Sequence, residues 1–237
     1  MLDKGVERRG PPKPAGFFGT VAIGFGRLIV PVVSLLGTAV VLWRFRAEVA
    51  TDFRFLTSLD KGLDPASDHW LTWGLVLLPL VWFVINLVNR RYGSGFTLLV
   101  VVVTWAIVAG GVFWAIRQGV IGAFANDIVP VNQAVAFGAA LFLGQLLCIY
   151  FFEGLRGIPW WEAPFVAALV AGVAQTFAFH ALIACLGTGT ISGAFSTDQW
   201  PRLLVLVVLQ FVWAFGQLLP TAMLRRVIRP LSGYGGA

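Results

Sequence analysis

Six apolar blocks of about 20 residues each restrict this chain more than any other feature of its sequence. They cover residues 24–43, 70–89, 96–116, 131–152, 163–187 and 203–224. An α-helix of that length spans a hydrocarbon core about 30 Å thick, and it satisfies its own backbone hydrogen bonds where no water is available. The alternating pattern typical of a membrane barrel is absent from these blocks. The sequence therefore predicts an all-α integral membrane protein, a compact bundle of six transmembrane helices.

The composition excludes an ordinary soluble domain. Of the 237 residues, 58% are hydrophobic and 12% are charged, whereas a soluble domain carries about 25% charged residues. Residues 1–23 are polar and basic, without the apolar core and cleavage site of a signal peptide. We therefore expect a disordered cytoplasmic leader over 1–23, a transmembrane domain over 24–228 and a cytoplasmic tail over 229–237.

The distribution of Lys and Arg predicts the orientation of the bundle. If the N-terminus is cytoplasmic, eleven of the 17 Lys and Arg residues fall on the cytoplasmic side. The positive-inside rule then favours an N-in, C-in topology in the inner (plasma) membrane of the cell, with Arg44 and Arg46 on the disfavoured side. The net charge of +6 comes from residues near helix ends, where anionic lipid headgroups lie. It indicates the lipid bilayer as a partner and no nucleic acid.

Amide side chains are the main polar groups inside the predicted spans. No Asp, Glu, Lys or Arg lies in the middle of a span, and the amides are Asn86, Gln145, Gln175, Gln210 and Gln217. A polar side chain in lipid needs a partner, and an amide offers both donors and an acceptor. Converging amides could read the edge of a planar heterocycle, as Asn and Gln read adenine in DNA. The alternative is that each amide binds a neighbouring helix.

The remaining candidates for chemistry are few. His180 lies four residues after Thr176, and Cys148 lies about one turn after Gln145. We interpret His180 as a hydrogen-bonded core residue, because the only other histidine, His69, lies at the outer interface and cannot complete a haem site with it. Neither cysteine has a nearby base, and metal ligands at helical spacing are absent from the sequence. We therefore expect no enzyme activity, no cofactor and no metal.

Two local patterns concern the shape and packing of the helices. Pro220 should kink the last helix and free the carbonyl near Gly216. Pairs of small residues four positions apart let helix backbones approach closely. These pairs are Ala106/Gly110, Ala140/Gly144 and Ala168/Gly172.

Two stretches and the end of the last block carry a likeness to a known family. The first stretch comprises Thr72-Trp73-Gly74, Pro79, Asn86-Leu87, Arg90 and Tyr92-Gly93. The second comprises Gly144-Gln145-Leu146-Leu147, Phe152, Leu155-Arg156, Trp160-Trp161, Ala163-Pro164, Thr176, Ala178 and Phe179. The last block ends at Leu219-Pro220 before a basic tail. Over about residues 70–228 the chain resembles the VUT family of vitamin uptake transporters, also called queuosine-precursor transporters.

The resemblance implies a six-helix inner-membrane carrier for a deazaguanine base, the precursor of a modified tRNA nucleoside. Four residues match the family pattern directly: Gln145, Trp160, Trp161 and Thr176. The chain departs from the family at intramembrane charges. An aspartate of the family is replaced at Asn86, Cys148 and Gln175, and a lysine is replaced at Gln210. The chain is therefore similar to a divergent member.

Two functions follow as hypotheses. In the first, the protein carries a small, neutral, planar solute, such as a queuosine precursor, through an uncharged cavity with little proton coupling. The residues that bind this substrate would be Asn86, Gln145, Cys148, Gln175, Thr176, Gln210 and Gln217. In the second, it is a non-transporting accessory subunit of a larger membrane complex built on the same fold. The sequence leaves open a homodimer or partners in a membrane complex.

Overall fold

The computed structural model describes residues 17–45, 71–118, 131–157, 159–188 and 200–229. These residues form the helices α1 (Phe17–Arg44), α3 (Trp73–Leu77), α4 (Leu80–Tyr92), α5 (Ser94–Arg117), α7 (Val131–Gly154), α8 (Glu162–Thr188), α9 (Trp200–Gly216) and α10 (Leu218–Leu224). By length and apolar composition, 6 segments of this described part can cross a membrane, where α3–α4 and α9–α10 each form one segment. The prediction of six apolar helices of membrane-spanning length is confirmed.

Helix α1 begins earlier than the sequence predicted. Its membrane-spanning part, Gly24–Arg44, agrees with the predicted block, but the helix starts at Phe17. No proline or charged residue lies between Phe17 and Arg27 to end the helix. The prediction of a disordered leader over 1–23 is therefore wrong for residues 17–23, and its remainder lies outside the described residues, as do residues 230–237 of the predicted tail.

Prolines lie at two breaks in the apolar helices. The second span, predicted as one helix over 70–89, is divided at Leu78 and Pro79 into α3 and α4. Pro79 has no N–H to donate, and it occupies the N-cap position of α4. The prediction of one continuous helix is therefore wrong here. The last span is divided at Gln217, less than one turn before Pro220, which confirms the predicted kink.

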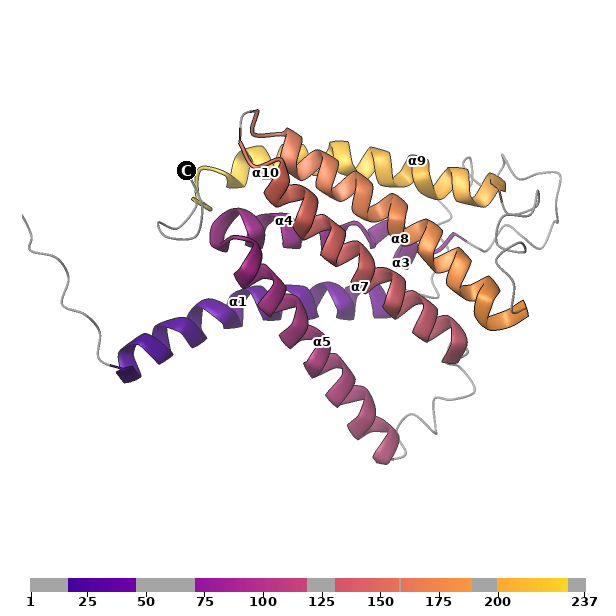
Figure 1. The fold of residues 1–237 in the computed structure, drawn as a ribbon, viewed down its shortest axis with the longest axis horizontal. Coiled ribbons are helices and arrows are strands. Elements are labelled where there is room, and N and C mark those ends of the chain that lie inside the picture. Colours follow the sequence, from indigo (N-terminus) through magenta and orange to yellow (C-terminus); the bar gives the residue numbers. More distant parts are fainter. Residues whose placement is uncertain (1–16, 46–70, 119–130, 158, 189–199, 230–237) are drawn as a thin grey trace, which may run out of the picture.

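Helix α4 is the centre of the bundle. It packs against α1, α5, α7 and α8, and α8 in turn packs against α7 and α9. The side chains of Trp82, Ile85, Asn86 and Asn89 on α4 are almost fully buried. Between α4 and α5 the chain reverses at Gly93, whose φ of 82° is a conformation that favours glycine. Helices α1 and α5 lie at the edge, and the end of α5 extends away from the other helices (Figure 1).

Glycines allow close contact in two of the three predicted pairs. A Cβ atom on Gly144 would lie 2.6 Å from the Trp82 ring and 3.1 Å from the Ala171 carbonyl oxygen, so α7 and α8 meet tightly here. At Gly172 the corresponding space is filled by the side chain of Gln210. Gly110 has no described atom within 4 Å of that position. The close approach predicted at Ala106/Gly110 is therefore wrong for the described residues.

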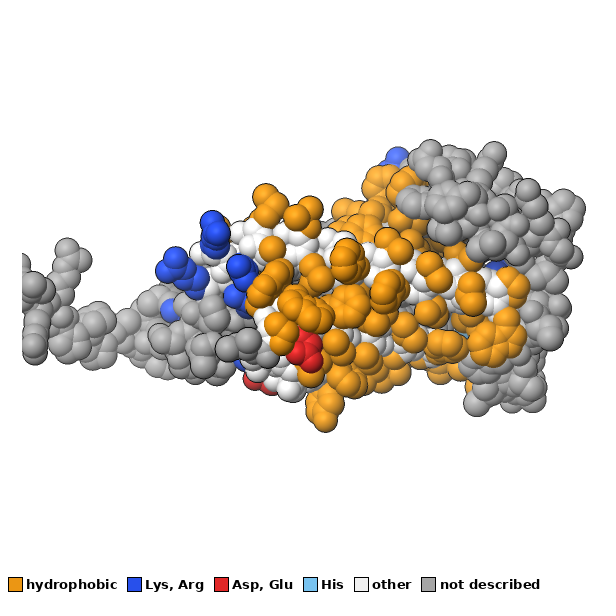
Figure 2. All heavy atoms as spheres, turned by 90° about the horizontal axis from the view of Figure 1, so that it is seen from above, with side chains coloured by type: hydrophobic (Ala, Val, Ile, Leu, Met, Phe, Trp, Pro, Cys, Tyr) orange, Lys and Arg blue, Asp and Glu red, His pale blue; other side chains and the backbone are white. Residues whose placement is uncertain are grey.

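The outer surface of the bundle is apolar along its middle and basic at one end (Figure 2). The arginines at that end come from the early part of α1, from α4, from the α7–α8 connection, and from the end of α10 with the residues after it: Arg27, Arg90, Arg91, Arg156, Arg225, Arg226 and Arg229. The start of α1 and the end of α10 lie at this same end of the bundle (Figure 1). We refer to it below as the arginine-rich end.

Candidate functional site

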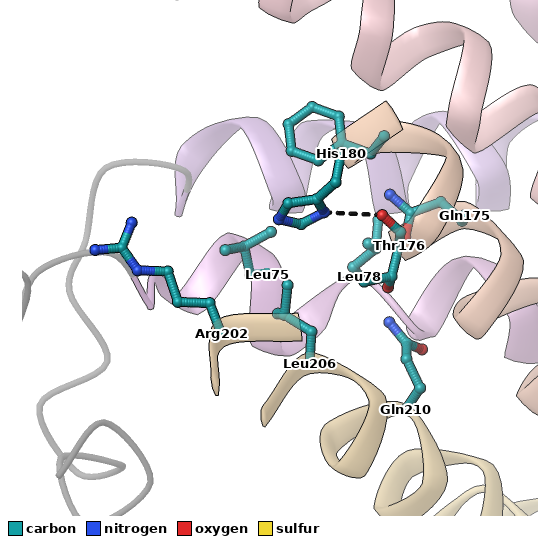
Figure 3. A pocket seen from close by; sticks show the side chains of 9 residues that line it. Leu75, Leu78, Gln175, Thr176, His180, Arg202, Leu206 and Gln210 are labelled. Carbon is teal, nitrogen blue, oxygen red and sulfur yellow. Dashed lines mark hydrogen bonds between the residues drawn. The ribbon is translucent and has the colours of Figure 1, made fainter. Parts of the chain in front are cut away.

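A cavity of about 180 Å³ lies between α3, α8 and α9. Five polar side chains line it: Gln175, Thr176 and His180 from α8, and Arg202 and Gln210 from α9. Leu75, Leu78, Phe179 and Leu206 complete the wall (Figure 3). Three of the seven residues predicted to bind substrate are thus brought together, namely Gln175, Thr176 and Gln210.

Helical periodicity places these side chains on one wall of each helix. Thr176 and His180 are four residues apart on α8, and Arg202, Leu206 and Gln210 follow at four-residue steps on α9. Both glutamines are deeply buried, with 3% of Gln175 and 2% of Gln210 exposed. The cavity therefore joins two polar stripes that face each other across the α8–α9 contact.

The two glutamine oxygens lack partners. The Oε1 atoms of Gln175 and Gln210 are buried and accept no hydrogen bond from any described residue. In Figure 3 the amide nitrogens of both side chains are directed toward the interior of the site. Rotation of either amide about its last torsion would exchange the donor for the acceptor. Each glutamine can therefore present an N–H group or a carbonyl oxygen to a bound molecule.

His180 contributes a second kind of polar edge. Its Nδ1 atom lies 2.9 Å from the backbone oxygen of Thr176. Because a carbonyl oxygen only accepts, Nδ1 carries the hydrogen, and Nε2 is an acceptor in the neutral ring. The interpretation of His180 as a hydrogen-bonded residue is confirmed, but its position on the cavity wall was missed. The hydroxyl of Thr176 donates to the carbonyl of Gly172 at 2.9 Å, within its own helix.

The cavity contains one charged side chain, so the predicted uncharged lining is wrong. Arg202 lies in the first turn of α9, which begins at Trp200 rather than at the predicted residue 203. Its aliphatic stem lines the cavity, and Figure 3 shows the guanidinium group directed away from both glutamines. The eight-residue spacing from Arg202 to Gln210, two steps of four residues on one helix face, was the sequence signal that could have found it.

Three other predicted residues belong to a separate hydrogen-bond cluster around the carbonyl of Pro164 near the start of α8. That oxygen accepts hydrogen bonds from Asn86 Nδ2 at 3.1 Å and from Gln217 Nε2 at 2.8 Å. Cys148 donates its S–H to Asn86 Oδ1 at 3.3 Å. The cluster therefore connects α4, α7, α8 and the break between α9 and α10. These three residues do not line the cavity.

The seventh predicted residue, Gln145, also serves helix packing. Its Oε1 atom accepts a hydrogen bond from Trp105 Nε1 at 2.6 Å, which joins α7 to α5. The seven predicted residues thus divide between one cavity and two sets of interhelical contacts. Among the described residues, no group of three His, Cys, Asp or Glu side chains is arranged to hold a metal ion.

Comparisons with protein families, with curated proteins and with solved structures return no match for this chain.

Proposed function

We propose that the protein is a multi-pass inner-membrane carrier for a small, neutral, planar solute that binds in the α3–α8–α9 cavity. The observation that supports this most is that Gln175 and Gln210, two buried glutamines whose Oε1 atoms have no described partner, line one cavity from two helices. A buried polar atom without a partner costs about 1–3 kcal/mol. When an amide rotates its oxygen into the cavity, a solute that offers a matching donor removes this cost on binding.

The chemistry of the wall favours a flat molecule with hydrogen-bonding edges. A glutamine pairs with a heterocycle through one N–H group and one oxygen in the same plane. A deazaguanine base, the queuosine precursor implied by the family resemblance, offers such edges together with a neutral ring. The volume of about 180 Å³ is below the range of about 300–1,000 Å³ that is usual for drug-sized ligands. It therefore suits a single small ring system.

A broken helix at the site supports a transport role. Leu78, which lines the cavity, lies at the break between α3 and α4. Discontinuous helices commonly form the substrate sites of transporters, because irregular backbone is tolerated where it borders a cavity. The break is a point at which the wall between the cavity and the outside can move.

We also propose that the arginine-rich end faces the cytoplasm, so that both ends of the chain lie there. This follows from the positive-inside rule, since the charged side chains of the described residues at that end are seven arginines, with Arg27 near the start of α1 included, and two glutamates, Glu153 and Glu162. A reporter fused after residue 237 should be active only as a cytoplasmic fusion. Activity of a periplasmic reporter at that position would contradict the orientation.

Uptake into proteoliposomes tests the carrier. Vesicles that contain the protein should take up a labelled deazaguanine base faster than protein-free vesicles, and the internal concentration should stop at the external one. An imposed pH gradient should leave the rate unchanged if the solute binds through the two glutamines, which carry no titrating proton. A rate that follows the gradient would assign a role to the His180 ring on the same wall. Uptake equal to that of protein-free vesicles contradicts the carrier, and uptake that follows the pH gradient contradicts an uncoupled mechanism.

A second function, an accessory subunit of a membrane complex, is favoured by the edge of the bundle. Large apolar side chains on α1 and α5 are widely exposed, among them Phe25 at 66%, Val30 at 67% and Trp114 at 61%. A protein partner could cover them as well as lipid does. Native electrophoresis after gentle detergent extraction separates the two: a fixed stoichiometry with other proteins supports the subunit, and a monomer or homodimer opposes it.

A further inference from the structure

Three arginines from separate parts of the chain gather at the arginine-rich end. Arg90 lies in the last turn of α4, Arg156 lies between α7 and α8, and Arg225 is the C-cap of α10. Arg156 donates hydrogen bonds to the backbone and side-chain oxygens of Asn89, the residue before Arg90, so it lies beside the end of α4. Arg225 and Arg156 are also the two charges whose repulsion acts on Arg90. Neighbouring cations of this kind favour an anion between them.

Only one of the three is neutralised by a described residue. Arg156 forms an ion pair with Glu153 at 2.8 Å and donates to the backbone oxygen of Asn89 at 2.8 Å. Within the described part of the chain, Arg90 and Arg225 form no ion pair, and the Nε atom of Arg90 is buried without a hydrogen-bond partner. The guanidinium of Arg225 lies over the Trp160 ring, 4.7 Å from its centroid. Arg225 is therefore an unneutralised cation beside Trp160, and Arg90 in the last turn of α4 is a second unneutralised cation at this end.

An apolar groove begins at the same tryptophan. It has a volume of about 850 Å³ and runs between the α7–α8 connection and the α9–α10 break. Its walls include Trp160, Phe165, Phe211, Phe215 and Ala222. Phe211 and Phe215 are 52% and 66% exposed, so the groove opens to the outside of the bundle. Ala222 lies three residues before Arg225, so this end of the groove lies next to Arg225.

We propose that this end is a binding site for one anionic phospholipid. The headgroup phosphate is held by Arg90 and Arg225, and an acyl chain lies in the groove along Phe211 and Phe215. A phosphate supplies the acceptor oxygens that guanidinium groups bind best. Tryptophan at this level suits the boundary between headgroups and hydrocarbon. The inference does not depend on which solute, if any, the protein carries.

Native mass spectrometry of the full chain in mild detergent tests this site. The protein is incubated with phosphatidylglycerol or with phosphatidylcholine of the same acyl chains, and the bound lipid is counted. We expect phosphatidylglycerol to be preferred by the wild type. The double variant Arg90→Gln/Arg225→Gln should lower its binding by at least about fivefold, the effect of about one membrane-facing charge or more. Phosphatidylcholine, whose ammonium group offsets its phosphate, should lose less.

Matched variants separate a site from general surface charge. Arg226→Gln/Arg229→Gln removes the same charge from exposed residues at the same end and should change binding by less than about twofold. Ala222→Phe fills the groove and should reduce the binding of both lipids. Arg225→Lys keeps the charge and should retain more phosphatidylglycerol binding than Arg225→Gln. Thermal unfolding of each variant in the same detergent identifies any variant that fails to fold. If a double variant does not fold, the comparison of Arg225→Lys with Arg225→Gln tests the site instead.

Three results would overturn the proposal. Equal losses in the two double variants would show diffuse attraction rather than a site. Release of the lipid by inorganic phosphate alone, with no difference between Ala222→Phe and wild type, would show a site for a soluble anion. No preference of the wild type for phosphatidylglycerol over phosphatidylcholine would show that the site does not select an anionic headgroup.

Discussion

The side chain of Gln210 on α9 lies against Gly172 on α8, in the space that a Cβ atom at residue 172 would occupy. The absence of a side chain at Gly172 therefore sets how closely the two helices approach at the cavity. In this position the Oε1 atom of Gln210 is buried away from solvent, and no described residue donates a hydrogen bond to it. The glycine thus acts on the candidate site although it has no polar side chain of its own.

Gly172→Ala should weaken solute binding more than it weakens the fold. The added methyl group would meet the amide end of Gln210, which is flexible and can move aside. Loss of that one aligned hydrogen-bonding group should lower the uptake rate at low solute concentration by about tenfold. The measurement is uptake into proteoliposomes, with thermal unfolding in detergent alongside it.

Gly110→Ala is the control for this variant, because no described atom lies within 4 Å of the added methyl group. It should leave uptake unchanged. If Gly172→Ala also transports at the wild-type rate, the packing of Gln210 on α8 has no role in binding.

Gly144→Ala should destabilise the bundle. The new methyl group would lie 2.6 Å from the Trp82 ring and 3.1 Å from the carbonyl oxygen of Ala171, and neither can move aside easily. Overpacking of this kind costs about 1–3 kcal/mol in the free energy of unfolding. Gly138→Ala on the same helix is the matched control, since its methyl group would make an ordinary 3.5 Å contact with Trp105. Equal stability of the two variants by denaturant titration would contradict the tight α7–α8 contact.

Asn86 and Gln217 should be energetically coupled through the carbonyl of Pro164. Each amide donates to the same oxygen, at 3.1 Å and 2.8 Å. Removing one leaves the oxygen satisfied by the other, so Asn86→Ala or Gln217→Ala alone should cost about 0.6 kcal/mol, a typical interhelical hydrogen bond in a membrane protein. The double variant should cost more than the sum, by about 0.5 kcal/mol or more. Strict additivity in a double-mutant cycle would contradict the shared acceptor.

The fold was predictable where the structure of a segment depends only on the sequence of that segment. The apolar blocks predicted the helices, because a membrane helix forms wherever about 20 apolar residues follow one another. Pro220 predicted the break at Gln217, because proline lacks the N–H group that a continuous helix needs. The break at Pro79 carries the same kind of signal and was not recognised. The start of α1 at Phe17 was missed because a polar, basic leader was extended too far toward the first apolar block.

The candidate site was less predictable because it depends on which helices are neighbours. Nothing local distinguishes Gln175, which lines the cavity, from Asn86, which donates to Pro164. Both are buried amides in apolar segments, and only the contact between α8 and α9 places Gln175 opposite Gln210. His180 was interpreted as a hydrogen-bonded core residue, and its contact with the Thr176 carbonyl confirms the hydrogen bond, but its place on the cavity wall beside Thr176 was not predicted. The sequence identified the buried polar residues, but it did not show which helices pack against each other.

Binding of a deazaguanine base to the purified protein tests the central claim most directly. The dissociation constant would be measured for wild type, for Gln175→Leu and Gln210→Leu, and for Asn86→Ala as a buried amide outside the cavity. Each leucine variant should bind about tenfold more weakly, while its stability is equal or higher because a buried unpaired oxygen has been removed. Asn86→Ala should bind as wild type does. Equal binding by wild type and both leucine variants, or no saturable binding by wild type, would contradict the account.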